Sequence, residues 1–116
     1  MKQIVLIFAI LVTSVSFAQN KNAKATMEVD GVCGMCKVRI EKAAIRTKGV
    51  KSAVWNVETH ELKLIYDQRK TDLKTIAQKL ADVGHDTKNI KATDEAYGKI
   101  DACCKYRDEE VVKAHH

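Results

Sequence analysis

The 116-residue chain has no proline and few aromatic residues: one Trp, three Tyr and two Phe. The lack of proline excludes cis-proline turns, and the short supply of aromatic side chains excludes a large aromatic core. The net charge of +5 is spread over interspersed lysines and acidic residues, so no basic block indicates nucleic-acid binding. With 46% hydrophobic and 30% charged residues, the chain has the composition of one soluble globular domain.

Long apolar runs are also missing, except at the N-terminus. Lys2 precedes an apolar run over Ile4–Val12, and Ser16-Phe17-Ala18 has the small-x-small pattern of a cleavage site. These features predict a secretory signal peptide over 1–18, cut after Ala18. A membrane span needs about 20 apolar residues, so we expect no span after cleavage. The predicted location is periplasmic or otherwise exported.

Hydrophobic periodicity divides the rest of the chain into alternating strands and helices. Gly49 and Gly84 are expected to end the two helices, and Thr71 to cap the second. The expected order is a strand over 26–30, a helix from 36, strands over 53–57 and 62–66, a helix from 71, and a weaker strand over 85–92. This order predicts an α+β fold, the ferredoxin-like βαββαβ sandwich, whose antiparallel sheet carries two helices on one face.

The expected domain organisation follows from these elements. A polar segment over 19–25 precedes a domain over 26–92, and a C-terminal cysteine-containing tail covers 93–116. The terminal histidines, His115 and His116, are most simply part of a disordered end.

Four cysteines carry the functional argument, and the first two form a Cys33-x-x-Cys36 motif at the predicted turn from strand to helix. Two thiols at this spacing can converge on one ion, and a helix N-terminus stabilises thiolates. Two soft thiolates suit Cu(I) first and Hg(II) second, whereas a closed zinc site needs four ligands. A disulfide, or two small buried residues, is the structural alternative.

Several segments resemble the heavy-metal-associated domain family, which includes copper chaperones, domains of copper-pumping ATPases and the periplasmic mercury-binding protein. The resemblance covers 26–92 and depends on Gly31–Cys36 (GVCGMC), Val38-x-Ile40-Glu41-Lys42-Ala43, Gly49-Val50, Tyr66-Asp67 and Gly84-His85. It implies that Cys33 and Cys36 bind the metal. It also places His85 beside the metal loop, as an additional ligand or a group that supports the ligands.

The chain departs from the family pattern in front of the motif. Relatives often carry Met two residues before the first cysteine, where it packs beneath the loop, and this chain has Gly31. The departure bears on the stiffness of the loop more than on ligation. Met35, between the cysteines, is expected to point outward.

Cys103 and Cys104 lie outside the resemblance, and their role is open. Adjacent Cα atoms are about 3.8 Å apart, so a disulfide between them would be strained. The pair could add thiolates to the Cys33/Cys36 metal, bind a second metal, contact a partner, or form disulfides with the first pair.

The sequence therefore predicts a metallochaperone or scavenger, not an enzyme, with Cu(I) as its cargo and Hg(II) or Zn(II) as alternatives. The expected partner is a metal-transporting ATPase or another metal-carrying protein, and the expected state is a monomer or a metal-bridged dimer. The rival hypothesis is a thiol–disulfide oxidoreductase using the same dithiol. Against it, the chain lacks the cis-proline that faces the dithiol in thioredoxins. No set of residues typical of hydrolysis or phosphoryl transfer is present.

Overall fold

The computed structural model describes residues 19–115, so the predicted signal peptide and His116 lie outside the described residues. Among residues 19–115, no helix has the length and apolar character that crossing a membrane requires.

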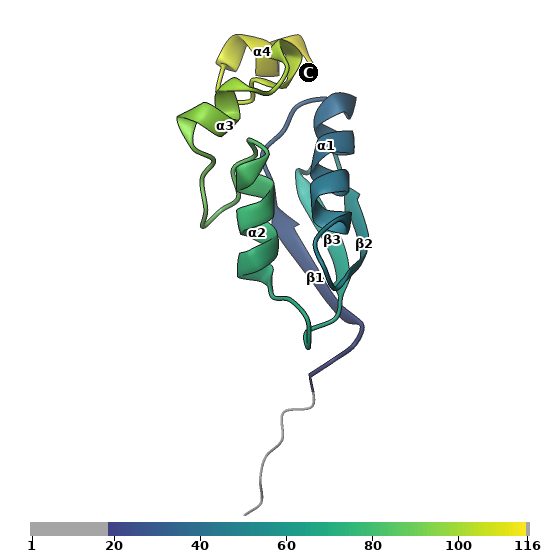
Figure 1. Cartoon of the computed structure of the whole chain (residues 1–116). Coiled ribbons are helices and arrows are strands. Elements are labelled where there is room, and N and C mark those ends of the chain that lie inside the picture. Colours follow the sequence, from purple (N-terminus) through teal and green to yellow (C-terminus); the bar gives the residue numbers. More distant parts are fainter. Residues whose placement is uncertain (1–18, 116) are drawn as a thin grey trace, which may run out of the picture.

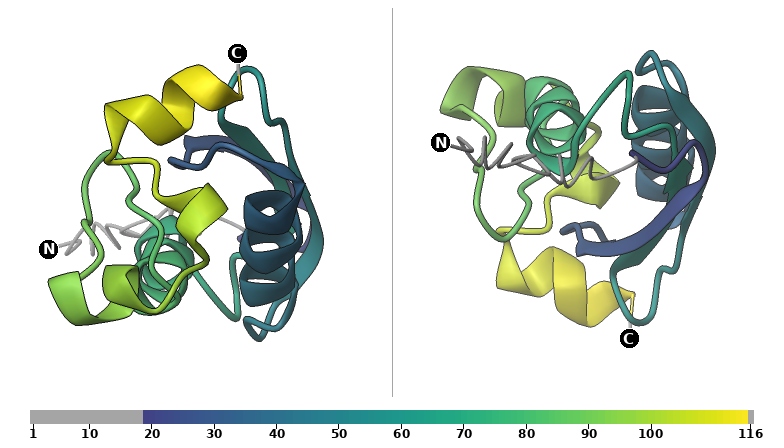
Figure 2. Two further views of the ribbon diagram at one scale, coloured as in Figure 1. Left: turned by 90° about the horizontal axis from the view of Figure 1, so that it is seen from above. Right: turned by 90° about the horizontal axis from the view of Figure 1, so that it is seen from below.

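Three antiparallel strands form the sheet: β1 (Ala23–Glu28), β2 (Val50–Trp55) and β3 (Glu61–Tyr66), in the spatial order β1-β3-β2. Two helices, α1 (Gly34–Ile45) and α2 (Leu73–Asp82), lie side by side on one face of this sheet (Figures 1 and 2). The prediction of a ferredoxin-like α+β fold with two helices on one face is confirmed.

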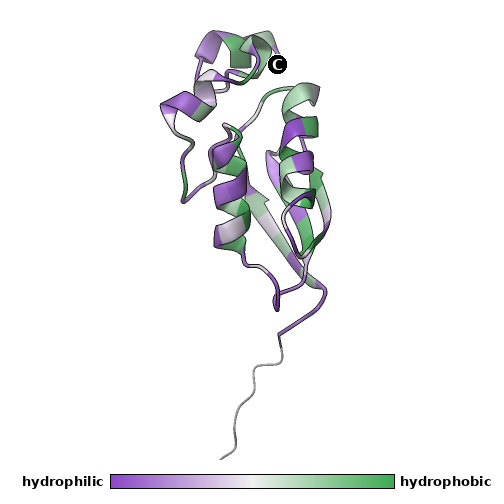
Figure 3. Cartoon of the chain, viewed as in Figure 1, coloured by the Kyte–Doolittle hydropathy of each residue, from purple (hydrophilic) through white to green (hydrophobic). Residues whose placement is uncertain are grey.

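The core lies between the helices and the sheet. Its largest fully buried apolar side chains come from both helices and from β2 and β3, namely Ile40, Trp55, Leu62, Leu64, Ile76 and Leu80. Each such side chain stabilises the fold by about 1.5–3 kcal/mol relative to exposure. Figure 3 shows apolar and polar residues alternating along the strands and helices, which is the pattern that predicted them.

Several boundaries differ from the prediction; the strand expected over 53–57, for example, is Val50–Trp55. The first strand begins at Ala23, inside the polar segment expected to precede the domain, because Ala23 is buried and continues the alternation of buried and exposed residues. The cap of α2 is Asp72 rather than Thr71: the Asp72 carboxylate accepts a hydrogen bond of 2.7 Å from the N–H of Thr75. Asp is the stronger capping residue, since its charge also favours a helix N-terminus.

The predicted last strand over 85–92 is wrong in extent, because it is reduced to one bridge between Val29 and Thr87. The chain turns away from β1 directly after this bridge. The N–H of Thr87 donates to the carbonyl of Ile90 (2.8 Å), and the Asp86 carboxylate accepts from the N–H of Ala92 (2.7 Å). These bonds use donors and acceptors that a fourth strand would need.

The C-terminal tail is ordered into three short helices. They are α3 (Asp94–Gly98), the 3₁₀ helix η1 (Ala102–Cys104) and α4 (Glu109–Ala114). The tail gathers at the end of the domain where α1 begins (Figures 1 and 2). It therefore covers the end of the fold that carries the Cys-x-x-Cys motif.

Candidate metal centre

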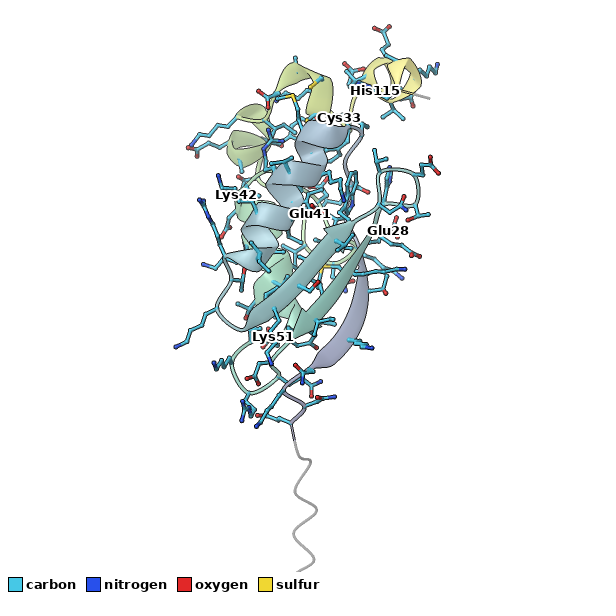
Figure 4. All side chains as sticks on the ribbon, turned by 90° about the vertical axis from the view of Figure 1, so that its right-hand side faces the viewer. Glu28, Cys33, Glu41, Lys42, Lys51 and His115 are labelled. Carbon is cyan, nitrogen blue, oxygen red and sulfur yellow. The ribbon has the colours of Figure 1, made fainter. Side chains whose placement is uncertain are left out.

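The Cys-x-x-Cys motif spans the junction between a loop and α1. Cys33 has an extended backbone (φ −144°) and is the residue before the helix, while Cys36 lies in the first turn and points into the core with Ile40 and Ala44. The two Sγ atoms are 3.6 Å apart. Figure 4 shows Cys33 at the N-terminal end of α1. Two converging thiols at a helix start are a favourable arrangement for soft-metal binding.

The tail brings its two cysteines to the first pair. The Sγ of Cys104 lies 3.0 Å from the Sγ of Cys33, and the Sγ of Cys103 lies 3.9 Å from it. Cys103 also contacts the sulfur of Met35 at 3.4 Å. All four cysteines are free thiols in this structure. Of the roles left open for the tail pair, this placement favours a contribution to the site at Cys33.

Solvent reaches this group of sulfurs from one side. Cys36 and Cys104 are buried, whereas Cys33 and Cys103 are half-buried. Cys33 and Cys103 line an open hollow of about 770 Å³, together with Gly34, Met35, Val38, Arg39 and Lys42. An ion can therefore arrive at Cys33 and Cys103, with the other two sulfurs behind them.

The four thiols differ in acidity. Burial raises the pKa of Cys33, but hydrogen bonds from the Cys104 thiol and the backbone N–H of Cys36 outweigh it and bring the pKa to about 7. Burial raises the pKa of Cys36, and it raises the pKa of Cys103 to about 11. Cys33 is therefore the thiol that ionises first, and thiolate is the form that binds metal.

Arg39 supplies positive charge beside the sulfurs. Its guanidinium donates to the Asp101 carboxylate (2.7 Å), and the side chain lines the same hollow as Cys33 and Cys103. Burial lowers the pKa of Arg39, but the nearby Cys104 thiol and the Asp101 carboxylate raise it overall, so the side chain stays charged. Sequence reasoning missed Arg39; its spacing of one helical turn from Cys36 was the available signal.

His85, the candidate additional ligand, is not brought into the group of sulfurs. Its Nδ1 lies 2.8 Å from the carbonyl oxygen of Asp30 and donates to it, and its Nε2 faces the Arg39 guanidinium at 3.4 Å. Burial is the main reason that the pKa of His85 falls to about 4, so the ring is neutral. The ring stacks on Tyr106, with centroids 5.6 Å apart. His85 therefore contacts the loop before Cys33, through Asp30, and the Arg39 side chain, but no sulfur.

Trp55 fills the space beneath the metal loop. Its ring is 1% exposed and its indole N–H donates to the carbonyl of Val29 (3.0 Å). A Cβ placed on Gly31 would lie 2.9 Å from the Trp55 ring and 3.0 Å from the Cβ of Cys36. The expected loss of loop stiffness at Gly31 is therefore offset, because the indole occupies the place beneath the loop. The sequence signal for this packing was a glycine two residues before the motif in a chain with a single Trp.

Tyr106 and Arg107 anchor the tail to the segment after α2. The Tyr106 hydroxyl donates to the carbonyl of Gly84 (2.7 Å) and accepts from the N–H of Asp86 (2.9 Å). Arg107 makes two hydrogen bonds to the Asp86 carboxylate and a third to the carbonyl of Ala92 (2.9 Å). The position of the tail thus depends on contacts outside the sulfurs.

Comparison with known proteins identifies the family of the domain that carries the Cys-x-x-Cys motif. The model of the heavy-metal-associated domain matches residues 26–86, more than half of the chain. The chain belongs to the heavy-metal-associated domain family. The match includes Cys33, Cys36 and His85 and ends before Cys103 and Cys104.

Three relatives illustrate the range of the family. A copper-exporting P-type ATPase of Staphylococcus haemolyticus (strain JCSC1435) is 34% identical over 64 residues, which are 54% of this chain and 8% of the ATPase. The solved CopZ metallochaperone is 30% identical, with 56% of this chain and 98% of CopZ covered and a TM-score of 0.54. The N-terminal domain of the zinc(II) ATPase ZiaA in its apo form is 33% identical, with 57% and 63% covered and a TM-score of 0.51.

Proposed function

We propose that this protein binds a soft metal ion, Cu(I) foremost, through Cys33 and Cys36, and acts as a metallochaperone or scavenger. The observation that carries the proposal is the 3.6 Å separation of the two Sγ atoms at the start of α1. One of these thiols has a pKa of about 7, so a thiolate is available near neutral pH. An ion bound there is cargo, held by thiolates and exchanged with the thiolates of a partner.

The preference for Cu(I) rests on the ligands. Two thiolates satisfy Cu(I), whereas structural zinc requires a closed set of four ligands. The names of a copper-exporting ATPase and of the CopZ metallochaperone among the relatives support copper, and the zinc(II) ATPase domain keeps Zn(II) as an alternative. Hg(II), which also accepts two thiolates, is the second alternative.

The proposal includes the location of the protein and the partner that receives the metal. The N-terminal pattern supports a periplasmic or otherwise exported protein, and the expected partner is a metal-transporting ATPase or another metal carrier. Arg39 and Lys42 line the hollow in front of Cys33, so an acidic surface around the partner's cysteines would be attracted to it.

A Cu(I) titration of the purified, reduced protein against bathocuproine disulfonate tests the proposal. We expect tight binding that the Cys33→Ser/Cys36→Ser variant loses. The matched control is Met35→Leu, which changes the residue between the cysteines and keeps both thiols. Parallel titrations with Zn(II) and Hg(II) rank the metals. The proposal would be refuted if the protein failed to take Cu(I) from the chelator, or if the double variant bound Cu(I) as tightly as the wild type.

Cys33 and Cys36 differ in pKa and in exposure, and this difference supports the oxidoreductase hypothesis as a second candidate. A half-exposed cysteine with a lowered pKa beside a buried one is the arrangement of dithiol exchange sites. The reduction potential of the dithiol, measured against glutathione, tests this second candidate. Insulin reduction at a rate comparable with a dithiol oxidoreductase would favour it.

A further inference from the structure

We propose that the tail turns the dithiol into a holding site in which Cys33, Cys103 and Cys104 bind one soft metal ion through three thiolates. The proposal rests on the proposed function, because Cys33 is shared: with Cys36 it forms the exchange site, and with the tail it forms the holding site. The sulfurs of Cys33, Cys103 and Cys104 all lie within 4.8 Å of one another.

The spacing of these sulfurs is close to that of a trigonal site. Three sulfurs bound to one ion at about 2.3 Å lie about 4 Å apart. The Cys33–Cys103 distance is 3.9 Å, and the Cys33–Cys104 distance of 3.0 Å has to widen by about 1 Å. Cys33 is half-buried rather than enclosed, and a rotation of its side chain would make this change.

Part of the charge of the site is countered by the protein. Three thiolates and one Cu(I) carry two net negative charges, which a buried position tolerates only with a nearby cation. Arg39 supplies one positive charge, since it lines the hollow with Cys33 and Cys103 and its guanidinium is held in place by Asp101, the residue before η1.

The tail cysteines are held in position before any ion arrives. The N–H of Cys104 donates to the carbonyl of Asp101 (2.8 Å), which sets the turn of η1. Beyond the turn, Tyr106 and Arg107 fix the chain to Gly84 and Asp86. A ligand set fixed in advance loses little conformational entropy on binding and therefore binds more tightly.

The holding site and the exchange site differ in how easily a partner's cysteine can reach the ion. Cys33 and Cys103 line the open hollow, and Cys104 lies buried behind them. An ion held by all three sulfurs has to lose a tail thiolate before a partner's cysteine can take its place. The ion is thus retained while the tail is closed, and it is available for exchange through Cys33 and Cys36 when the tail opens.

X-ray absorption at the copper edge, on the purified protein loaded with one Cu(I), tests the proposal directly. We expect three sulfur neighbours in the wild type and in Cys36→Ser, and two in Cys103→Ser/Cys104→Ser. In competition with bathocuproine disulfonate, the tail variant should bind Cu(I) about 10–100-fold more weakly. Because Cys104 is buried, the half-exposed Cys103→Ser is measured as well, and circular dichroism checks that each variant is folded.

The outcomes separate this proposal from the proposed function. Two sulfur neighbours in the wild type, with unchanged affinity in the tail variants, would overturn the holding site and leave the exchange site intact. Loss of the third sulfur in Cys36→Ser but not in the tail variants would overturn it equally. Undiminished binding by Cys33→Ser/Cys36→Ser would instead refute the proposed function.

Discussion

The guanidinium of Arg107 makes two hydrogen bonds, of 2.8 and 3.1 Å, with the carboxylate of Asp86. The pair joins the tail to the segment that follows α2, and the same guanidinium lies over the ring of Tyr97, 4.3 Å from its centroid. Charge-assisted bonds in this two-point geometry are stronger than neutral ones. The position of the cysteines in η1 therefore depends on an ion pair that contains no sulfur.

Replacing Arg107 should loosen the tail. Hydrogen bonds to charged groups contribute about 1.5–3 kcal/mol each, so Arg107→Ala should speed the labelling of Cys104 by iodoacetamide about 10–100-fold. Mass spectrometry of the labelled peptide measures the rate. Lys113→Ala, in the exposed part of α4, is the matched control and should leave it unchanged. Equal rates in the wild type and Arg107→Ala would show that other contacts hold the tail.

Low pH should weaken the ion pair between Arg107 and Asp86. Burial raises the pKa of Asp86, but hydrogen bonds from Arg107 and the N–H of Ala92 outweigh it and hold the pKa below the usual 3.8. A carboxyl group with a lowered pKa in the folded state stabilises the fold above its unfolded pKa. This contribution is lost as the pH falls below about 3.8 towards the folded value.

Urea unfolding between pH 3 and pH 7 checks this expectation. The wild type should lose more stability over the acid part of the range than Asp86→Asn, which has no carboxylate to protonate. Glu58→Gln, at an exposed hairpin position, is the control and should follow the wild type. Parallel curves for the wild type and Asp86→Asn would contradict the assignment.

The glycines on either side of Cys33 should respond differently to a side chain. Gly31→Met, which restores the residue common in the family, should destabilise the fold by about 1–3 kcal/mol, because Trp55 and Cys36 leave no room for it. Gly34→Ala should cost nothing, or stabilise by up to about 1 kcal/mol, since nothing lies within 4 Å of its added Cβ. Urea unfolding followed by Trp55 fluorescence measures both. An equal cost at the two positions would contradict the placement of Trp55.

Arg39 should influence the metal without binding it. Arg39→Met removes the cation beside Cys104 and the ion pair with Asp101, so Cu(I) affinity should fall by about tenfold or more. Arg39→Lys should recover part of the loss, which a purely structural role would not predict. Arg46→Met, further along the chain after α1, is the control and should bind as the wild type does. Unchanged affinity in Arg39→Met would remove Arg39 from the site.

Periodicity predicted the elements that bury one face. The two helices and three strands of the domain were predicted because their apolar residues recur at the helix or strand period. The reduction of the predicted fourth strand to one bridge was not predictable in this way, since the hydrogen bonds of this segment go to the Thr87–Ile90 turn and to the side chains of Tyr106 and Arg107. Such contacts between distant polar residues leave no local pattern in the sequence.

For the metal site too, the sequence predicted the local part and not the contacts made by the tail. The spacing of Cys33 and Cys36 and the turn before α1 follow from local sequence, and the structure places the two sulfurs together. The approach of Cys104, 71 residues from Cys33, depends on the path of the whole tail. Arg39 was overlooked because its neighbours, Asp101 and Cys104, come from that tail.

The bridge at Val29 and Thr87 leaves the outer edge of β1 without a neighbouring strand among residues 19–115. An open strand edge can add a strand from another molecule, which is how ordered aggregates begin. Lys24, Thr26 and Glu28 are exposed along β1, and charges at an edge oppose such growth. The tail contacts that hold residues 84–92 away from the sheet thus also leave Lys24 and Glu28 as the charged side chains that guard the open edge of β1.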